Sequence, residues 1–323
     1  MGISKIVSNF VSPVLSIPGV FARATRNLLV TFNYHEISDN PSQFCTDFNL
    51  NVRPEIFAKQ LLWIKKYFNI ITPQQLVSGD FELPAAIVTF DDGFEGVFNE
   101  GAKLLKKAGI PAVVFMNMAP IQGQSCWSGL VTYLCEYDDA FKQHISKKYD
   151  RPIQPDFFLY CTQEDVQEYL DHYGNSVLDK ADVYHGKFAS KNDLLESAAN
   201  GLYLGNHLFN HYNAASLSLQ DLEQQYLLNE SALSEFSNTV PLFSYPFGQP
   251  QRCYNRDTDE LLSSLGAAHL FTAYQLFNRD PNARRLHRTT MFEDINSESL
   301  FRVNCLLPAS INTLLRKKVW ATD

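Results

Sequence analysis

The stretch that decides the fold is AAIVTFDDGFEGVFNEGAKLLKKAGIPAVVFMNM, residues 85–118. Its first six residues form an uncharged apolar run typical of a strand buried on both faces, and Asp91, Asp92 and Gly93 follow at once. Residues 95–108 have apolar side chains at helical spacing, and residues 113–115 begin a second buried strand. The stretch therefore predicts a strand–helix–strand unit with both aspartates at the carboxyl end of a parallel sheet or barrel, where such folds place their chemistry.

Composition narrows the class of protein. The chain has 323 residues, of which 45% are hydrophobic, so it can form a large core. Its formal net charge of -8 argues against a nucleic-acid partner, and we expect none. The six cysteines form no C-x-x-C pair, which is typical of reduced, buried thiols in a cytoplasmic protein.

Both ends of the chain combine apolar and basic residues. Residues 1–27 are rather apolar, but serines, an asparagine and two prolines interrupt them, which argues against a cleaved signal peptide or a membrane span. Residues 307–323 place apolar residues beside Arg316, Lys317 and Lys318. We expect either peripheral contact with the inner face of a membrane or, as the favoured alternative, packing of both ends on a catalytic domain of residues 28–306.

The rest of the chain repeats strands and helices of similar size. Further strands are predicted at 28–34, 202–207, 241–245, 268–274 and 284–291, with helices at 54–68, 219–236, 257–265 and 297–306. Residues 119–201 lack this alternation, and we interpret them as a helical insertion that covers one side of the site. The pattern favours an α/β fold, an irregular parallel (β/α) barrel.

A second motif complements the aspartates. His207 and His211 are four residues apart, so in a helical turn both imidazoles would project from one side, as zinc-binding histidine pairs do. With Asp92 as a third ligand they would form an open site that has room for water and substrate. Asp91 would then be free to accept a proton. We therefore expect one divalent metal ion, with zinc preferred, although cobalt, nickel or manganese also suit two imidazoles and a carboxylate.

Three motifs resemble those of a known family. Residues 89–93 (TFDDG), 205–211 (GNHLFNH) and 244–248 (SYPFG) are similar, in this order, to the three motifs of the polysaccharide deacetylase family, also called the NodB-homology family or carbohydrate esterase family 4. The similarity extends from about residue 32 to residue 291. The resemblance implies an irregular barrel of the NodB-homology type and a divalent metal held by Asp92, His207 and His211.

The resemblance also implies a function, which is hydrolysis of an N-acetyl or, less often, an O-acetyl group on a sugar. Asp91 is the expected general base, metal-bound water is the nucleophile, and the backbone N–H of Phe247 belongs to an oxyanion hole. The expected substrate is an acetylated polysaccharide, a glycolipid or a lipid-linked precursor at the cytoplasmic face. Tyr245 and Trp127 are candidate sugar contacts, although core packing is the alternative for Trp127.

The chain departs from the family pattern at two positions. Leu208 follows the first histidine of the second motif, where the family usually has Ser or Thr. Ser244 occupies the position of the arginine that normally holds the base aspartate. Either Arg288 or Arg285 is the expected replacement for that arginine.

The sequence leaves alternatives for the identity of the general acid and for the function of the protein. Residues 286–287 resemble the region that supplies the acid of the family, which makes His287 a candidate, and His35 at the end of a predicted strand is an equal one. The alternative functions are a catalytically impaired carbohydrate-binding relative and a metal-dependent amidase on a non-sugar substrate. The intact Asp91 argues against the first, because a site kept only for binding has no use for a free carboxylate.

Overall fold

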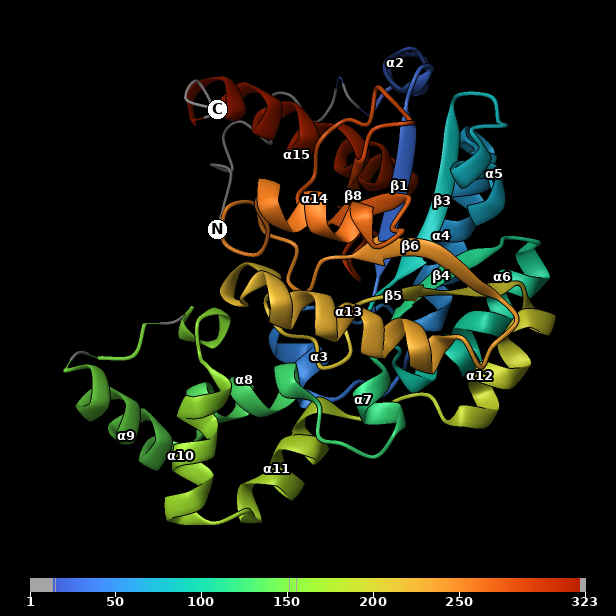
Figure 1. The fold of residues 1–323 in the computed structure, drawn as a ribbon. Coiled ribbons are helices and arrows are strands. Elements are labelled where there is room, and N and C mark those ends of the chain that lie inside the picture. Colours follow the sequence, from blue (N-terminus) through green and yellow to red (C-terminus); the bar gives the residue numbers. More distant parts are fainter. Residues whose placement is uncertain (1–13, 15, 151, 155, 320–323) are drawn as a thin grey trace.

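A computed structural model describes residues 14, 16–150, 152–154 and 156–319 of the chain (Figure 1). In this part of the chain the strands lie close to the predicted positions. They are β1 (Leu29–Tyr34), β2 (Asn69–Ile70), β3 (Ala85–Phe90), β4 (Ala112–Met116), β5 (Leu202–Asn206), β6 (Thr239–Ser244), β7 (His269–Thr272) and β8 (Arg285–Thr290).

The strands form a closed parallel barrel. Among the described residues, seven strands pair in the order β1-β8-β7-β6-β5-β4-β3, and β3 pairs again with β1. The short β2 adds only to the first two residues of β3, and the register shifts between β5 and β6. The predicted irregular parallel barrel is therefore confirmed.

Side-chain alternation along the strands separates the inside of the barrel from the outside. One buried cluster combines residues of six strands, such as Leu29, Ile87 and Phe271, which can meet only inside the ring. The intervening residues, such as Val88, pack outward under the helices. Asp91 continues the inward row of β3, so it emerges at the carboxyl end of the barrel interior.

Helices surround the barrel, and the expected helix at 95–108 begins with a π-helical turn, η1, before α6. The α-helices are α2 (Pro18–Thr25), α3 (Gln43–Asp47), α4 (Pro54–Tyr67), α5 (Pro73–Ser78), α6 (Ala102–Ala108), α7 (Met118–Ile121), α8 (Trp127–Tyr137), α9 (Asp139–Tyr149), α10 (Gln163–Tyr173), α11 (Ser176–His185), α12 (Lys191–Ser197), α13 (Leu219–Leu233), α14 (Arg256–Ser264) and α15 (Glu298–Val319). The short segments of other helix types are η1 (Val97–Gly101), η2 (Phe157–Leu159), η3 (Ala198–Asn200) and η4 (Ala214–Ser216).

The helical insertion forms a lobe beside the barrel. Figure 1 shows α8, α9, α10 and α11 (green to yellow-green) grouped on one side of the molecule. They share an apolar core of their own that includes Val131, Phe141 and Tyr169. The chain then returns through α12 and η3, which pack near η1 and α6, and enters β5. Helical structure between residues 119 and 201 agrees with the sequence interpretation.

Buried residues near both chain ends pack among the helices that surround the barrel. Phe21 of α2 is fully buried, and its ring lies 4.8 Å from that of Tyr67 and 6.3 Å from that of Phe301. Helix α15 runs on to Val319, so the segment predicted as a separate tail from residue 307 continues the helix expected to end near 306. Residues 1–13 and 320–323 lie outside the described residues. In the described part, no helix has the length and apolarity that a membrane crossing needs.

Candidate active site

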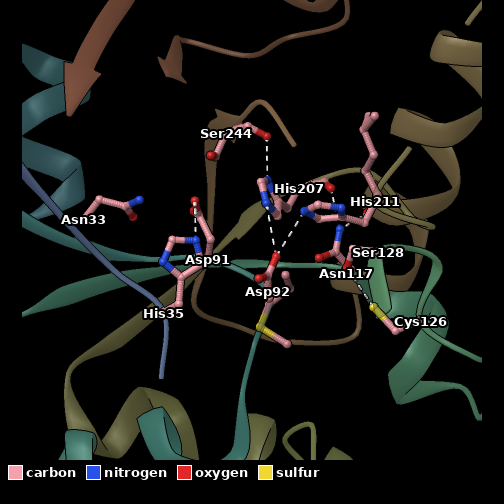
Figure 2. Close-up of polar contacts among 12 residues, drawn as sticks. Asn33, His35, Asp91, Asp92, Asn117, Cys126, Ser128, His207, His211 and Ser244 are labelled. Carbon is pink, nitrogen blue, oxygen red and sulfur yellow. Dashed lines mark hydrogen bonds and ion pairs between the residues drawn. The ribbon is translucent and has the colours of Figure 1, made fainter. Parts of the chain in front are cut away.

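Three side chains converge at the carboxyl end of the barrel (Figure 2). Nε2 of His207 lies 3.4 Å from Oδ1 of Asp92, and Nε2 of His211 lies 3.2 Å from the same oxygen. All three residues are buried, and their ligand atoms lie within 4.8 Å of one another. Atoms about 2.1 Å from a tetrahedral ion are roughly 3.4 Å apart, so the spacing suits a single divalent cation.

The hydrogen bonds of Asp92 and His207 also suit a divalent cation between these side chains. Nδ1 of His207 lies 2.7 Å from the carbonyl oxygen of Ser244. Because a carbonyl only accepts, Nδ1 carries the proton, and Nε2 presents a lone pair to Asp92. Oδ1 of Asp92 is buried and accepts no hydrogen bond. An acceptor nitrogen that faces a buried acceptor oxygen is unfavourable without a cation between them. The donor set therefore fits a divalent metal ion.

The backbone, rather than a helix, brings the two imidazoles together. Residues 207–213 form a loop, so the expected helical turn is wrong. Leu208 and His211 both have a φ of 60°, and Asp92 and Phe247 have φ values of 70° and 61°. Left-handed φ values are unfavourable for such side chains and are found mainly where function requires them. Four of them therefore mark this end of the barrel as the functional one.

Two asparagines hold this strained loop. Nδ2 of Asn117 donates to the carbonyls of His207 and Leu208, and Oδ1 of Asn206 accepts from the N–H of Leu208 at 2.9 Å. The Leu208 side chain is fully buried in a cluster outside the barrel that includes Phe243. The departure from the family pattern at this position therefore does not change the lining of the site.

Asp91 is held by an arginine inside the barrel. Nη1 and Nη2 of Arg288 donate to its two carboxylate oxygens at 2.7 and 2.6 Å, and both side chains are buried. Arg288 also donates to Asn33 at 2.9 Å and to Ser244 at 2.8 Å. Burial alone would raise the pKa of Asp91, but the guanidinium outweighs it and lowers that pKa. Asp91 is thus ionised at neutral pH. Ser244, which occupies the position of the family's arginine, contacts Arg288, the arginine that holds Asp91 in this protein.

Asp92 is ionised for a related reason. Burial alone would raise its pKa, but without a metal ion the positive charge of protonated His211 and His207 outweighs this effect and holds the pKa well below its usual range. Two ionised carboxylates therefore lie next to each other in the chain. One faces the two histidines and the other faces Arg288.

The structure does not bring Arg285 or His287 to this site. Alternate residues of β8 point to opposite sides, so Arg288 faces inward while these two face outward. Arg285 forms an ion pair with Asp259 of α14, and Nδ1 of His287 lies 3.0 Å from Oγ1 of Thr272. Of the two candidate arginines and the two candidate acids, only Arg288 and His35 lie in the site.

His35 lies on the other side of the aspartate pair from the two clustered histidines (Figure 2). Its Nε2 is 3.8 Å from Oδ2 of Asp91. Burial lowers the pKa of His35, and the nearby Asp92 and Asp91 only partly offset this effect. The imidazole is therefore neutral at pH 7. Asn33, two residues before His35, also lines the site, and the sequence analysis missed it. Side chains alternate along a strand, so the position of His35 already indicates that Asn33 faces the same side.

These residues form the floor of a cavity of about 430 Å³. Aromatic side chains dominate its walls, namely Phe44, Phe48, Phe158, Phe247 and Phe292. Phe158 comes from the insertion, which therefore covers one side of the cavity. Phe247 also contacts His211, with ring centroids 4.8 Å apart.

The two predicted sugar contacts lie elsewhere. Tyr245 is buried outside the barrel, where its hydroxyl donates to Asp259 at 2.7 Å, because it alternates with the inward Ser244. Trp127 lines a neighbouring cavity and packs edge-on against Tyr212, with ring centroids 5.0 Å apart. Neither residue lines the cavity that contains the aspartates.

Fold and site together define the chain as a NodB-type (β/α)7 barrel with a buried polar site at the carboxyl ends of its strands. The chain belongs to the polysaccharide deacetylase family, whose model matches residues 79–270, more than half of its length. The resemblance of the three motifs is thereby confirmed. Membership implies a carbohydrate esterase that acts on acetylated polysaccharides.

Solved structures with the same fold are distant in sequence. IcaB from Ammonifex degensii is 18% identical, with a TM-score of 0.56 over 86% of this chain and 97% of that one. The deacetylase PplD from Streptococcus pyogenes, solved with acetate, is 16% identical, with a TM-score of 0.57 over 87% and 98%. A de-N-acetylase from Aggregatibacter actinomycetemcomitans is 16% identical, with a TM-score of 0.56 over 84% and 98%. No curated protein matches the chain significantly.

Proposed function

We propose that this protein is a metal-dependent hydrolase that removes N-acetyl groups from the sugars of an acetylated glycan. The observation that carries the proposal is the arrangement of two adjacent carboxylates. Asp92 faces the two histidines, whereas Asp91 is ionised, paired with Arg288 and directed into the same cavity. A protein that only binds a glycan has no need of the second carboxylate, so the arrangement favours turnover over the impaired relative.

Asp92, His207 and His211 would hold one divalent ion, with zinc preferred among the metals that this donor set accepts. When bound, such an ion supplies Lewis acidity, which polarises an acyl carbonyl and acidifies water. The hydrogen bond from His207 to Ser244 keeps Nε2 available as a ligand.

Asp91 is the proposed general base. Arg288 uses two hydrogen bonds to fix the plane of its carboxylate, which leaves the remaining lone pairs for a proton from the attacking water. The new C–O bond forms as that proton leaves the water. The backbone N–H of Phe247 is proposed to donate to the oxyanion of the tetrahedral intermediate.

His35 is the proposed general acid. It is neutral in the free protein and lies next to Asp91, so it can accept the proton that Asp91 has taken up. Protonated His35 then donates to the amine nitrogen as the C–N bond breaks. Acetate and the free amine of the sugar are the products, and Asp91 returns to its ionised state.

The aromatic walls of the cavity favour a second candidate, an amidase that acts on a non-sugar N-acyl substrate. Phe44, Phe48 and Phe292 could pack against an apolar group as well as against the face of a sugar ring. The same catalytic residues would serve both reactions. Comparing acetate release from N-acetylhexosamine glycans with release from N-acetyl amino acids separates the two.

We also propose that the protein acts at the cytoplasmic face of a membrane, on a glycolipid or lipid-linked precursor. All six cysteines are unpaired and buried, as expected in a reducing compartment. Ile17 and Leu314, from the two ends of the chain, are 50% and 68% exposed and could contact a lipid surface. Finding the native protein in the periplasm or the medium would contradict this proposal.

The test of function is acetate release from N-acetylhexosamine oligosaccharides by the protein loaded with zinc, with Asp91→Asn and His35→Ala as variants. We expect each to lower kcat by about 10²–10⁴-fold, the usual contribution of general acid–base catalysis. His287→Ala is the matched control and should keep full activity. Unchanged turnover in Asp91→Asn with metal still bound would refute the role of the base. Release from N-acyl amino acids alone would favour the amidase.

A further inference from the structure

One wall of the catalytic cavity comes from the loop that follows β1. Residues 37–50 leave the barrel after Glu36 and return beside it, because the backbone N–H of Glu36 donates to the carbonyl of Leu50 at 3.2 Å and the N–H of Val52 donates to that of Glu36 at 3.0 Å. A compact surface loop whose ends are joined in this way is an Ω-loop. Helix α3 lies in its middle, and Figure 1 shows this helix (blue) next to the insertion. We call residues 37–50 the wall loop.

The wall loop contributes Phe44 and Phe48 to the cavity. Their ring centroids lie 5.1 Å apart, and the ring of Phe48 lies 6.0 Å from that of Phe158 in the insertion. Phe158 lies 5.8 Å from Phe247, which contacts His211. These phenyl rings therefore form a continuous row from a proposed metal ligand to the wall loop. A substrate bound at the metal cluster lies beside this row, so the position of the wall loop affects how tightly the substrate is held.

The carboxylate of Asp47 fastens the wall loop to the insertion. Its Oδ2 accepts from the hydroxyl of Tyr137 in α8 at 2.6 Å and from that of Tyr184 in α11 at 3.0 Å. Its Oδ1 accepts from Gln43, within α3, at 2.7 Å. Burial alone would raise the pKa of Asp47, but these hydrogen bonds outweigh this effect and lower the pKa, so the carboxylate is ionised at neutral pH. Hydrogen bonds to an ionised acceptor are about twice as strong as neutral ones.

Packing holds the wall loop against the same end of α11. The ring of Phe44 lies 5.7 Å from that of Tyr184 and 4.6 Å from that of His185. Gly186 follows α11 with a φ of 95°, and a Cβ there would lie 2.7 Å from the Cβ of Ser42. Glycine at this position therefore permits both the turn and the close approach of the wall loop. Helix α11 thus contacts the wall loop through a hydroxyl, through aromatic rings and through its terminal glycine.

We propose that Asp47 is a positioning residue for the substrate. It acts through Phe44 and Phe48, because the hydrogen bonds that it accepts from the insertion hold the wall loop in place beside the cavity. The insertion thereby sets substrate affinity, whereas the reacting groups belong to the barrel and keep their geometry when the hydrogen bonds of Asp47 are lost. The inference rests on the proposed function and adds a determinant of substrate binding to it.

The test compares two variants that weaken this connection with a matched control. Tyr184→Phe removes one hydroxyl and keeps the ring, and Asp47→Ala removes the acceptor of both hydroxyls. The control is Tyr169→Phe. Tyr169 is also a buried tyrosine of the insertion, and its hydroxyl donates to Asp138 at 2.8 Å, but it belongs to the core of the insertion and not to the contact with the wall loop.

The first readout is the steady-state kinetics of acetate release from N-acetylhexosamine oligosaccharides. We expect KM to rise by about three- to tenfold in Tyr184→Phe and by at least as much in Asp47→Ala, the usual effect of one or two hydrogen bonds. Both variants should keep kcat within about twofold of the parent, because the loss concerns binding and not the reacting groups. Asp47→Asn keeps an acceptor oxygen and should recover most of the affinity. The control should match the parent in both constants.

Hydrogen–deuterium exchange gives a second readout, which does not depend on turnover. Backbone amides of residues 37–50 should exchange faster in Asp47→Ala than in the parent or in Tyr169→Phe, while those of β3 stay unchanged. Unchanged exchange in the wall loop would overturn the inference, as would a fall in kcat as large as the rise in KM or an equal effect in the control.

The proposed function can fail separately, if the parent releases no acetate from any oligosaccharide. Calorimetric binding of the same oligosaccharides then decides. Weaker binding by Asp47→Ala than by Tyr169→Phe supports the positioning role, and equal or absent binding in the parent and both variants refutes it.

Discussion

Replacing Arg288 with Met is expected both to destabilise the protein and to abolish acetate release. The guanidinium is fully buried and makes two hydrogen bonds to Asp91, in addition to those to Asn33 and Ser244. Methionine has a similar length but leaves an ionised carboxylate buried without a cation. Breaking a buried pair in this way typically costs about 3–5 kcal/mol, a large part of the stability of an ordinary domain.

A double-mutant cycle isolates this effect from the loss of packing. Asp91→Asn removes the charge that Arg288 neutralises, so the double variant should be more stable than Arg288→Met alone. We expect a coupling energy of about 2 kcal/mol or more. The free energy of unfolding is measured by urea denaturation at pH 7 with a chelator present, so that bound metal does not contribute.

The control is Arg285, which lies three residues before Arg288 on β8 and faces outward from the barrel. Arg285→Met breaks an ion pair in which Arg285 is 29% exposed and Asp259 is buried. Because Asp259 keeps its hydrogen bond from Tyr245, the loss should be about 1–2 kcal/mol, smaller than for Arg288→Met, and acetate release should stay intact. Additive effects of Arg288→Met and Asp91→Asn would refute the reasoning, because they would mean that the two groups do not interact. Equal losses of stability in the variants at positions 288 and 285 would do the same.

Three further outcomes are expected. Zinc at about 100 times its Kd should stabilise the parent by about 2.7 kcal/mol and leave Asp92→Ala unaffected, as thermal shifts would show. Gly96→Ala should lose about 1–3 kcal/mol in urea unfolding, because its Cβ would lie 1.9 Å from Oε1 of Glu36 and 2.4 Å from the carbonyl of Ile37. Burial raises the pKa of Glu36 to about 7, so the folded state binds more protons than the unfolded one above the ordinary carboxyl pKa. Stability should therefore fall by about 3 kcal/mol as the pH rises from about 4.5 to 7, and Glu36→Gln should remove this dependence.

Much of the fold could be predicted because the barrel is built from buried parallel strands. Most of the strands, such as β3 and β4, are short apolar runs that end abruptly in polar residues, and this pattern marks both the position of the strand and its functional end. The meeting of Asp92 with His207 follows from the same rule. The inward position of Arg288 could also be predicted, because Arg288 lies two residues after the apolar Leu286 and shares its face of the strand, whereas Arg285 lies on the opposite face.

Other features depend on information that spacing alone does not contain. The four-residue separation of His207 and His211 suggested a helical turn, but left-handed backbone at Leu208 and His211 produces the convergence instead. Nothing in local propensity indicates such a conformation, because Asn117 and other residues distant in the sequence impose it. The place of Trp127 likewise depends on how the insertion packs against the loop that follows β5.

Strand β8, which closes the barrel by pairing with β1 and β7, carries the cation that pairs with Asp91. The site is therefore complete only after this last strand has been synthesised. Asp92, His207 and His211 all precede β6 in the chain, and the carbonyl that accepts from Nδ1 of His207 is that of Ser244 at the end of β6. Arg288 belongs to β8, which is translated last of the strands and fills the gap between β7 and β1. Asp91 thus gains its cation only when the ring closes. A chain that ends before residue 285 would contain the three proposed metal ligands but would lack the cation that pairs with the proposed base.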